Sequence, residues 1–389
     1  DSRTEMASVN HMIAREEDGS WGTWSSGTND DVNRIVTGLD GTRYICGAFT
    51  SPYNRIAAWD GNSFSDLNGG LAGGIGGGTA TEATGMAVSP SGEIFVVGRF
   101  ATAGGVTAPA IASWDGSSWT AYDDGTFSAS TIGLDVAIAP DGTIYFYSFG
   151  GLHRWTGSAW VSILSTATGL PRLMGFNGAG ELVLVGTMTV MDGVSISNGV
   201  AKYNGSAWVD LGDTGLPADH YVSALDDGLR LYVGGADGLA VYNGSNWEIL
   251  GEIVGDEIYG MAFDSDGVLH IIGRFTAIGG ASCLANYAVW NGSAFFPGDV
   301  GVSSGTPQLL GIDVSRKSVA IGFDSVASFF AASVNGVFNG GSAAAYPVFT
   351  LTGPGQVYLI NNLTTGKTIG FELDLLDGEE LTIDLRPGE

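Results

Sequence analysis

The chain has 389 residues, of which 44% are hydrophobic and only 14% are charged, so it can bury a large core and is not intrinsically disordered. Its 15 Lys and Arg face 41 Asp and Glu, which gives a formal net charge of −26 and disfavours binding to nucleic acid or to an anionic membrane. No stretch approaches the roughly 20 apolar residues of a membrane-spanning helix. We therefore expect no nucleic-acid partner and no membrane insertion.

The first predicted element is a hairpin over residues 13–21, which matches residues 56–64 position for position around an Asp-Gly turn. Similar turns, in which an aromatic residue precedes Asp, Asn or Thr and then Gly, recur at Trp59-Asp60-Gly61, Trp114-Asp115-Gly116, Trp155-Thr156-Gly157, Tyr203-Asn204-Gly205, Tyr242-Asn243-Gly244 and Trp290-Asn291-Gly292. Asp-Gly and Asn-Gly supply the positive φ angles of tight hairpins. Each turn therefore predicts two antiparallel strands, C and D.

A second type of hairpin, A–B, precedes each C–D hairpin from residue 40 onward. Its B strand is a nearly continuous apolar run, such as residues 94–97 or 182–185, which is typical of a strand that is buried on both faces. We count seven A–B hairpins, the last one ending at Phe323. Successive turn glycines are 39 to 55 residues apart, which is about the length of a propeller blade.

These elements predict an all-β fold, a seven-bladed β-propeller over residues 1–340 with a small antiparallel β-domain over 341–389. The N-terminal hairpin has no A–B hairpin before it, so we expect it to close the ring by pairing with the last A–B hairpin. Residues 330–338 also resemble a C–D hairpin, which leaves an eight-bladed ring, or a seventh blade formed wholly from the C-terminal side, as alternatives.

All ten Trp are assigned to the C–D hairpins, where flat rings suit the wedge between neighbouring sheets. We predict a blade-packing role for Trp59, Trp114, Trp119, Trp155, Trp160, Trp208, Trp247 and Trp290. Cys46 and Cys283 are predicted to be buried free thiols rather than a disulfide.

Two resemblances follow from these motifs. Residues 97–119 and 272–290 carry the order Gly-Arg-Phe, a Gly-Gly pair and a Trp-Asp/Asn-Gly turn, which resembles kelch-type and related bacterial and phage propeller repeats over about residues 10–340. Residues 349–355, 362–369 and 381–388 resemble the C-terminal β-domain of tail proteins from long-tailed bacteriophages. That match stops where the family's domain would continue, so we expect an incomplete domain here. The resemblance to tail proteins also implies that the protein lies in a virion tail and forms a symmetric homo-oligomer.

The sequence offers little catalytic chemistry. The four His residues, His11, His153, His220 and His270, have no metal-ligand spacing. Arg34, Arg43, Arg55, Arg99 and Arg274 are the candidates for a carboxylate-binding cluster, but Arg99 and Arg274 share one repeat position, which favours a structural role. We predict no catalytic residue, no metal and no cofactor.

We therefore predict a non-enzymatic structural or binding module of a bacteriophage-like tail, in the tail tip or a fibre. Its partners would be a host cell-surface glycan or protein, or other tail subunits, and its place the virion tail or the extracellular space. The long inserts at 68–84, 101–110, 189–199 and 276–287 are the candidate binding loops. A secreted adhesin or polysaccharide-binding propeller is the first alternative, and a glycan-cleaving propeller enzyme is the second.

Overall fold

The computed structural model of this chain describes residues 6–9, 12–15, 21–22, 24–25, 27–74, 81–177, 179–197, 199–212, 222–225, 230–263, 267–283, 287–297, 300–304, 307–313, 318–323, 327–331, 348–352, 355–362, 367–375 and 380–384. Every regular element within these ranges is a β-strand. Among these residues there is no helix with the length and apolarity to cross a membrane. The chain divides into two compact units, a larger one over Met6–Ala332 and a smaller one whose described strands lie between residues 348 and 384.

The described part of the larger unit contains seven four-stranded antiparallel blades, each with its strands in the order A, B, C and D. Blade 1 consists of β4 (Val32–Thr37), β5 (Arg43–Gly47), β6 (Ile56–Trp59) and β7 (Phe64–Ser65), and blade 2 of β9 (Glu82–Val88), β10 (Ile94–Arg99), β13 (Ile111–Trp114) and β14 (Trp119–Ala121). Blade 3 consists of β15 (Gly133–Ile138), β16 (Ile144–Ser148), β17 (Gly151–Trp155) and β18 (Trp160–Leu164), and blade 4 of β20 (Pro171–Phe176), β21 (Leu182–Gly186), β24 (Val200–Tyr203) and β25 (Trp208–Asp210). Blade 5 consists of β26 (Val222–Leu225), β27 (Leu231–Gly234), β28 (Gly238–Tyr242) and the first part of β29 (Trp247–Phe263). Blade 6 consists of the last part of β29 with β30 (Leu269–Ile278), β32 (Tyr287–Trp290) and β33 (Phe295–Pro297). Blade 7 consists of β35 (Pro307–Asp313), β36 (Ser318–Phe323), β2 (Met12–Arg15) and β3 (Trp21–Gly22).

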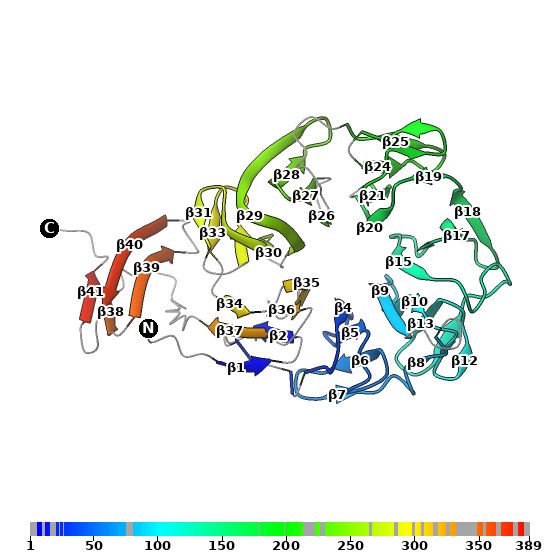
Figure 1. Ribbon diagram of the computed structural model, residues 1–389, viewed down its shortest axis with the longest axis horizontal. Helices are drawn as coiled ribbons and strands as arrows, with labels where there is room; N and C mark the ends of the chain where they lie inside the picture. Colours follow the sequence, from blue (N-terminus) through cyan, green and yellow to red (C-terminus); the bar gives the residue numbers. More distant parts are fainter. Residues whose placement is uncertain are drawn as a thin grey trace. The chain divides into compact units, whose positions relative to one another are not determined.

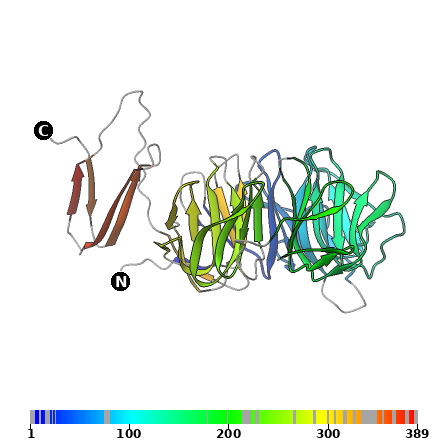
Figure 2. The ribbon, with the colours of Figure 1, turned by 90° about the horizontal axis from the view of Figure 1, so that it is seen from above.

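The A strands form the inner wall of a closed ring. Each A strand contacts the A strand of the next blade in chain order, and β35 of blade 7 contacts β4 of blade 1 (Figure 1). The predicted seven-bladed β-propeller is therefore confirmed. Because neighbouring strands of a blade are antiparallel, all A–B and C–D turns lie on one face of the ring, the turn face. The B–C and D–A connections lie on the other, the insert face, and the strands run between the two faces (Figure 2).

Blade 7 combines strands from both ends of the larger unit. Strand β2 pairs with β36 over four residues, Met12 opposite Gly322 to Arg15 opposite Val319, and β3 completes the blade outside β2. Strand β37 (Ala327–Ala331) is not a C strand of a further blade, although residues 330–338 resemble a C–D hairpin. It pairs instead with β1 (Met6–Val9) and β34 (Val300–Ser304). Residues 332–347 lie outside the described residues.

All four long inserts contribute strands to small sheets. The B–C insert of blade 2 is a hairpin of β11 (Thr102–Ala103) and β12 (Val106–Thr107), and it pairs with β8 (Leu71–Ala72) in the preceding D–A connection. Equivalent small sheets contain β19 (Ala167–Thr168), β22 (Val190–Met191) and β23 (Val194–Ser195) in blade 4, and β31 (Ala281–Ser282) with parts of β29 and β30 in blade 6. In blade 7 the same position is taken by β34, β37 and β1. The chain thus enters and leaves the propeller through two adjacent strands of one such small sheet.

Strand B ends in a glycine for a steric reason. In the Val97-Gly98-Arg99-Phe100 motif, a Cβ on Gly98 would lie 2.2 Å from the carbonyl oxygen of Glu82 on strand A. Strand A carries a bulge at this level, which brings its backbone close to strand B. The equivalent glycines of blades 1, 4 and 6, Gly47, Gly186 and Gly273, meet the same obstacle. The predicted burial of strand B on both faces is confirmed, since Ile94 to Gly98 are all buried.

The C–D turns differ from the predicted type. In the turn after Trp114, Gly116 has a φ of +99° and none of the other loop residues has a positive φ, so this is not a two-residue hairpin loop with two positive φ angles. The Asp115 side chain accepts hydrogen bonds from the backbone N–H groups of Ser117 and Ser118 and closes a four-residue loop. Two successive positive φ angles occur instead at Gly104-Gly105 in the blade 2 insert.

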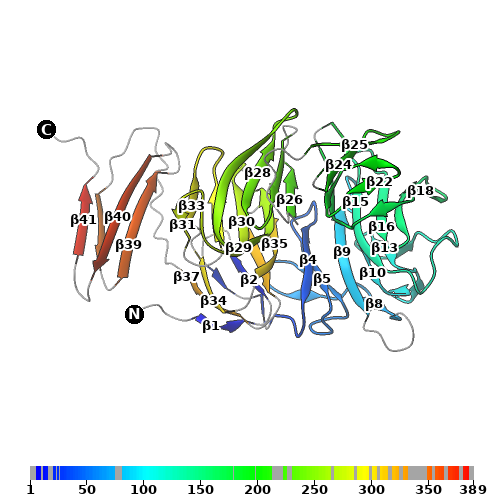
Figure 3. The ribbon, with the colours of Figure 1, turned by 45° about the horizontal axis from the view of Figure 1, so that its top comes forward.

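The smaller unit contains two described strand pairs. Strand β38 (Val348–Thr352) pairs with β41 (Glu380–Asp384), and β39 (Gly355–Asn362) pairs with β40 (Lys367–Leu375) (Figure 3). The sequence predicts hairpin turns at Pro354-Gly355 and Asp377-Gly378, which would join β38 to β39 and β40 to β41. Pro354, Asp377 and Gly378 lie outside the described residues, and the described pairs join β38 to β41 and β39 to β40.

Candidate functional site

The tryptophans singled out in the sequence lie in the layers between blades. Trp59, Trp114, Trp119, Trp160, Trp208, Trp247 and Trp290 are buried, and Trp155 is partly buried. The hydrophobic clusters that contain them cross from blade to blade. One cluster joins Cys46 and Leu67 of blade 1 to Val96 and Trp119 of blade 2. The main cores of the propeller therefore lie between adjacent sheets.

A repeated hydrogen bond fixes these layers. Four D-strand tryptophans donate their indole N–H to a backbone carbonyl of the preceding blade, always three residues after the equivalent aromatic residue of that blade. The pairs are Trp119 to Leu67 (2.7 Å), Trp160 to Tyr122 (2.8 Å), Trp208 to Ile163 (3.2 Å) and Trp247 to Leu211 (3.0 Å). We call this contact the interblade indole bond. It satisfies a buried donor and links neighbouring blades.

Blades 1 and 6 have Phe64 and Phe295 at this position and cannot form the bond. In the same two blades the C-strand indole nitrogens, Trp59 Nε1 and Trp290 Nε1, are buried with no hydrogen-bond partner among the described residues. Trp24, assigned from the sequence to a C–D hairpin, lies instead after β3 in the connection to blade 1. It is 1% exposed and stacks on Trp59 with ring centroids 5.6 Å apart.

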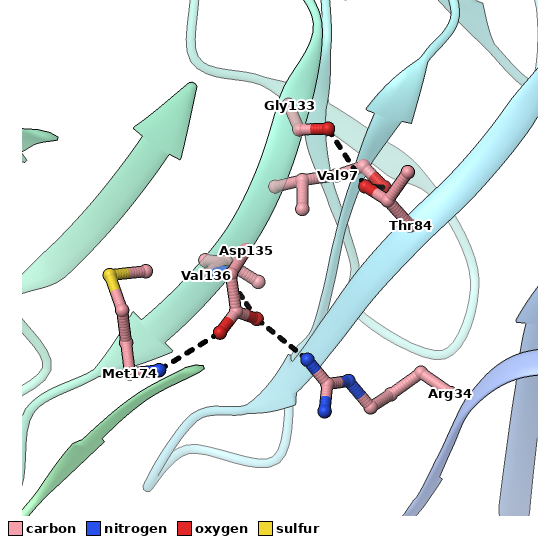
Figure 4. A network of polar contacts seen from close by, with 7 residues as sticks. All are labelled: Arg34, Thr84, Val97, Gly133, Asp135, Val136 and Met174. Atoms are coloured by element: carbon pink, nitrogen blue, oxygen red, sulfur yellow. Dashed lines mark hydrogen bonds and ion pairs between the residues drawn. The ribbon is translucent and has the colours of Figure 1, made fainter. Parts of the chain in front are cut away.

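Polar side chains and backbone groups of the A strands contact one another on the inner wall of the ring. Arg34 on β4 reaches past blade 2 to Asp135 on β15, with Arg34 Nη2 2.9 Å from Asp135 Oδ1. The other carboxylate oxygen accepts a hydrogen bond of 3.0 Å from the backbone N–H of Met174 on β20 (Figure 4). A Cβ on Gly85 of β9 would lie 3.1 Å from Asp135 Oδ1, so the bare glycine leaves room for this ion pair. One network therefore connects the A strands of blades 1, 3 and 4.

Shorter bonds continue this network between neighbouring blades. Thr84 Oγ1 donates to the carbonyl oxygen of Gly133 at 2.8 Å, which links blades 2 and 3 (Figure 4). Asn33 Nδ2 donates to the carbonyl oxygen of Ala83 at 2.8 Å, which links blades 1 and 2. These bonds hold the inner strands of four successive blades in register around the axis.

A cavity of about 380 Å³ adjoins the ion pair. Its walls are residues of the A strands of blades 2, 3 and 4, and Arg34 and Asp135 are its charged lining residues. The lining residues are Arg34, Met86, Ala87, Val88, Asp135, Val136, Ala137, Ile138, Met174, Gly175 and Phe176. Along each strand they run from the ion pair toward the A–B turn, so this axial pocket extends toward the turn face.

The electrostatics of the pocket are governed by burial. The Asp135 side chain is 6% exposed and that of Arg34 is 24% exposed. Burial raises the pKa of Asp135, while the Arg34 guanidinium and the backbone N–H groups of Val136 and Met174 act in the opposite direction. The ion pair is close to neutral as a unit. Arg34 Nε is buried without a hydrogen-bond partner among the described residues.

This arrangement favours binding over covalent chemistry. The two ionisable residues of the pocket neutralise each other, and no Ser, Thr, Cys or His lines it. Within the described ranges, no group of three or more His, Cys, Asp or Glu side chains is placed to hold a metal ion. Polar ligand atoms could be recognised there, but the lining residues contain no nucleophile paired with a base.

The other candidate residues are dispersed. Arg99 approaches Glu82, and Arg274 forms a 2.9 Å ion pair with Asp256, so both bind an acid on their own blade's A strand. His153 and His270 are buried in separate blades, and His11 and His220 lie outside the described residues. Cys46 and Cys283 are buried free thiols, as predicted, and burial raises their pKa values to about 12 and about 11.

The sequence reasoning missed the axial ion pair, although a signal was present. Arg34, Gly85 and Asp135 each follow the bulge in strand A of blades 1, 2 and 3, so they occupy one repeat position. A strand-by-strand alignment places a cation, a glycine and an anion at that position in successive blades.

No family model matches this chain. No curated protein matches it either. A streptogramin B lyase structure superposes with a TM-score of 0.54 at 10% identity, covering 82% of this chain and 98% of that one. YCF48 bound to a D1 peptide gives 0.52 at 12% identity, covering 85% and 99%. The extracellular domain of BT4673 from B. thetaiotaomicron gives 0.54 at 10% identity, covering 85% of this chain but only 40% of that one. At these identities the likeness shows the β-propeller fold alone.

Proposed function

We propose that this protein is a non-catalytic structural and binding module of a bacteriophage-like tail, at the tail tip or in a fibre. Its propeller contacts a host-surface glycan or protein, or a neighbouring subunit. The observation that carries the proposal is the C-terminal sequence, whose segments at 349–355, 362–369 and 381–388 resemble tail proteins. The described strands of that unit pair as antiparallel β-structure, which suits such a domain.

The construction of the propeller supports a display role. The chain enters the propeller at β1 and leaves it at β37, and these two strands are paired. The interblade indole bonds and the axial network connect successive blades. Blades that are bonded to one another suit a module that presents a surface to a partner.

The non-catalytic part of the proposal rests on the axial pocket, whose ionisable residues are bonded to each other. It is tested by incubating the protein with the surface polysaccharide of the host bacterium and measuring reducing ends. An unchanged concentration is expected. An increase that depends on the protein would establish the glycan-cleaving alternative.

The tail assignment is tested by immunogold electron microscopy. Phage particles induced from a bacterial strain that carries the gene are purified and labelled with antibodies against the propeller. Gold at the end of the tail is the expected result. Gold absent from particles, with the protein recovered from the medium or the cell envelope, would reject the tail and favour the secreted adhesin.

A further inference from the structure

The walls of the axial pocket are rich in backbone hydrogen-bonding groups. Strands β9, β15 and β20 each stand at the edge of their sheet, so their side away from strand B has N–H and C=O groups without a ladder partner. The Met174 N–H uses one of these positions to bond Asp135. The remaining edge groups can pair with the alternating donors and acceptors of a polar ligand.

Arg34 adds side-chain donors to these walls. Its Nη2 bonds Asp135, and its Nε is buried beneath the pocket surface. The Arg34 side chain lines the pocket and is 24% exposed, so a ligand oxygen can approach its remaining guanidinium N–H groups. The ligand therefore presents an oxygen acceptor beside the ion pair.

Charge and size narrow the class of ligand. The net charge of −26 disfavours an anion, and a cation would meet the positive charge of Arg34 in the pocket lining. A volume of about 380 Å³ lies at the low end of the range for ligand pockets, about 300–1,000 Å³. That space fits one or two sugar rings and is too small for an extended peptide strand. Met86 and Phe176 supply apolar wall for the C–H faces of such rings.

We propose that the axial pocket binds the terminal one or two rings of a neutral saccharide. Arg34 donates to a saccharide oxygen, and the free edges of β9, β15 and β20 bond the hydroxyl groups. This inference rests on the binding part of the proposed function and names both the site and the ligand class.

The test is saturation-transfer difference NMR on the full chain. The neutral probes are glucose, galactose, mannose, N-acetylglucosamine and rhamnose, and the anionic probes are glucuronic acid and N-acetylneuraminic acid. Arg34→Lys keeps a positive charge beside Asp135 but removes the planar donors. Arg274→Lys is the matched control, because Arg274 is exposed on blade 6 and its ion pair with Asp256 does not line the pocket.

The expected result is saturable binding of at least one neutral sugar, unchanged in Arg274→Lys and weakened at least tenfold in Arg34→Lys at an unchanged Tm. If Arg34→Lys does not fold, Phe176→Leu replaces it, with a several-fold loss expected. Binding of only the anionic probes, binding of no probe, or neutral binding that survives both pocket variants would each overturn the inference. Each of those results leaves the tail proposal standing, because the immunogold experiment does not depend on the pocket.

Discussion

The interblade indole bond makes Trp119→Phe the sharpest test of how the blades are held together. The Trp119 ring is 7% exposed, and its N–H bonds the carbonyl of Leu67, which is also buried. Phenylalanine keeps most of the aromatic area but leaves that carbonyl with one donor fewer. The lost bond costs about 0.5–1.5 kcal/mol, and the lost ring atoms add about 1 kcal/mol. We expect a destabilisation of about 1.5–2.5 kcal/mol.

Trp290→Phe is the matched control. Trp290 is 9% exposed and loses the same ring volume, but its Nε1 has no hydrogen-bond partner among the described residues. Urea unfolding of both variants is followed by circular dichroism. Their unfolding free energies are compared through the urea concentrations at the midpoints, provided that the slope of free energy with urea is unchanged. Trp119→Phe should be the costlier change by about 0.5–1.5 kcal/mol. Equal costs, or a costlier Trp290→Phe, would refute the role assigned to the bond.

Three further changes test other parts of the fold. Phe295→Trp should place an indole N–H against the carbonyl of Leu250, three residues after Trp247, and stabilise the protein by about 0.5–1.5 kcal/mol in urea unfolding; a loss of stability would contradict this. Gly98→Ala should destabilise by about 1–3 kcal/mol through its clash with strand A, whereas Gly150→Ala, with its nearest contact at 3.4 Å, should change stability by less than about 0.5 kcal/mol. Backbone hydrogen bonds lower the pKa of Asp115, so its contribution to stability is present above its ordinary pKa near 4 and is lost as the pH falls below it. The Tm advantage of the wild type over Asp115→Asn at pH 7 should therefore shrink steadily as the pH falls below about 4, and an advantage at pH 2 as large as that at pH 7 would contradict the assignment.

The blades could be predicted from the sequence because their signals are local. A turn glycine, an aromatic residue on each side and an apolar B strand all lie within about 25 residues, and they recur with every blade. The turn after Trp114 shows the limit of such signals. Its Asp-Gly pair predicts the hairpin correctly but not the loop type, because the Asp115 side chain, rather than a second positive φ, closes the loop.

The candidate site could not be predicted in the same way. Arg34 and Asp135 lie 101 residues apart and meet only because the closed ring brings the A strands of blades 1 and 3 together across Gly85. The inserts at 101–110 and 189–199 show a second limit. Their length in the sequence does not reveal that their hairpins pair with the preceding connection or that Ala103 and Met191 are fully buried. Their role as binding loops stays a prediction.

The central claim is a ring closed by strands from both ends of the larger unit, and an engineered disulfide tests it most directly. Ala14 of β2 and Ala320 of β36 are cross-strand partners in blade 7. The Ala14→Cys, Ala320→Cys double variant, oxidised in its native state, should yield a tryptic peptide pair linked through these residues and a raised Tm, with Cys46 and Cys283 still reduced. Two free introduced thiols after oxidation, or cross-links only between different molecules, would contradict the closure.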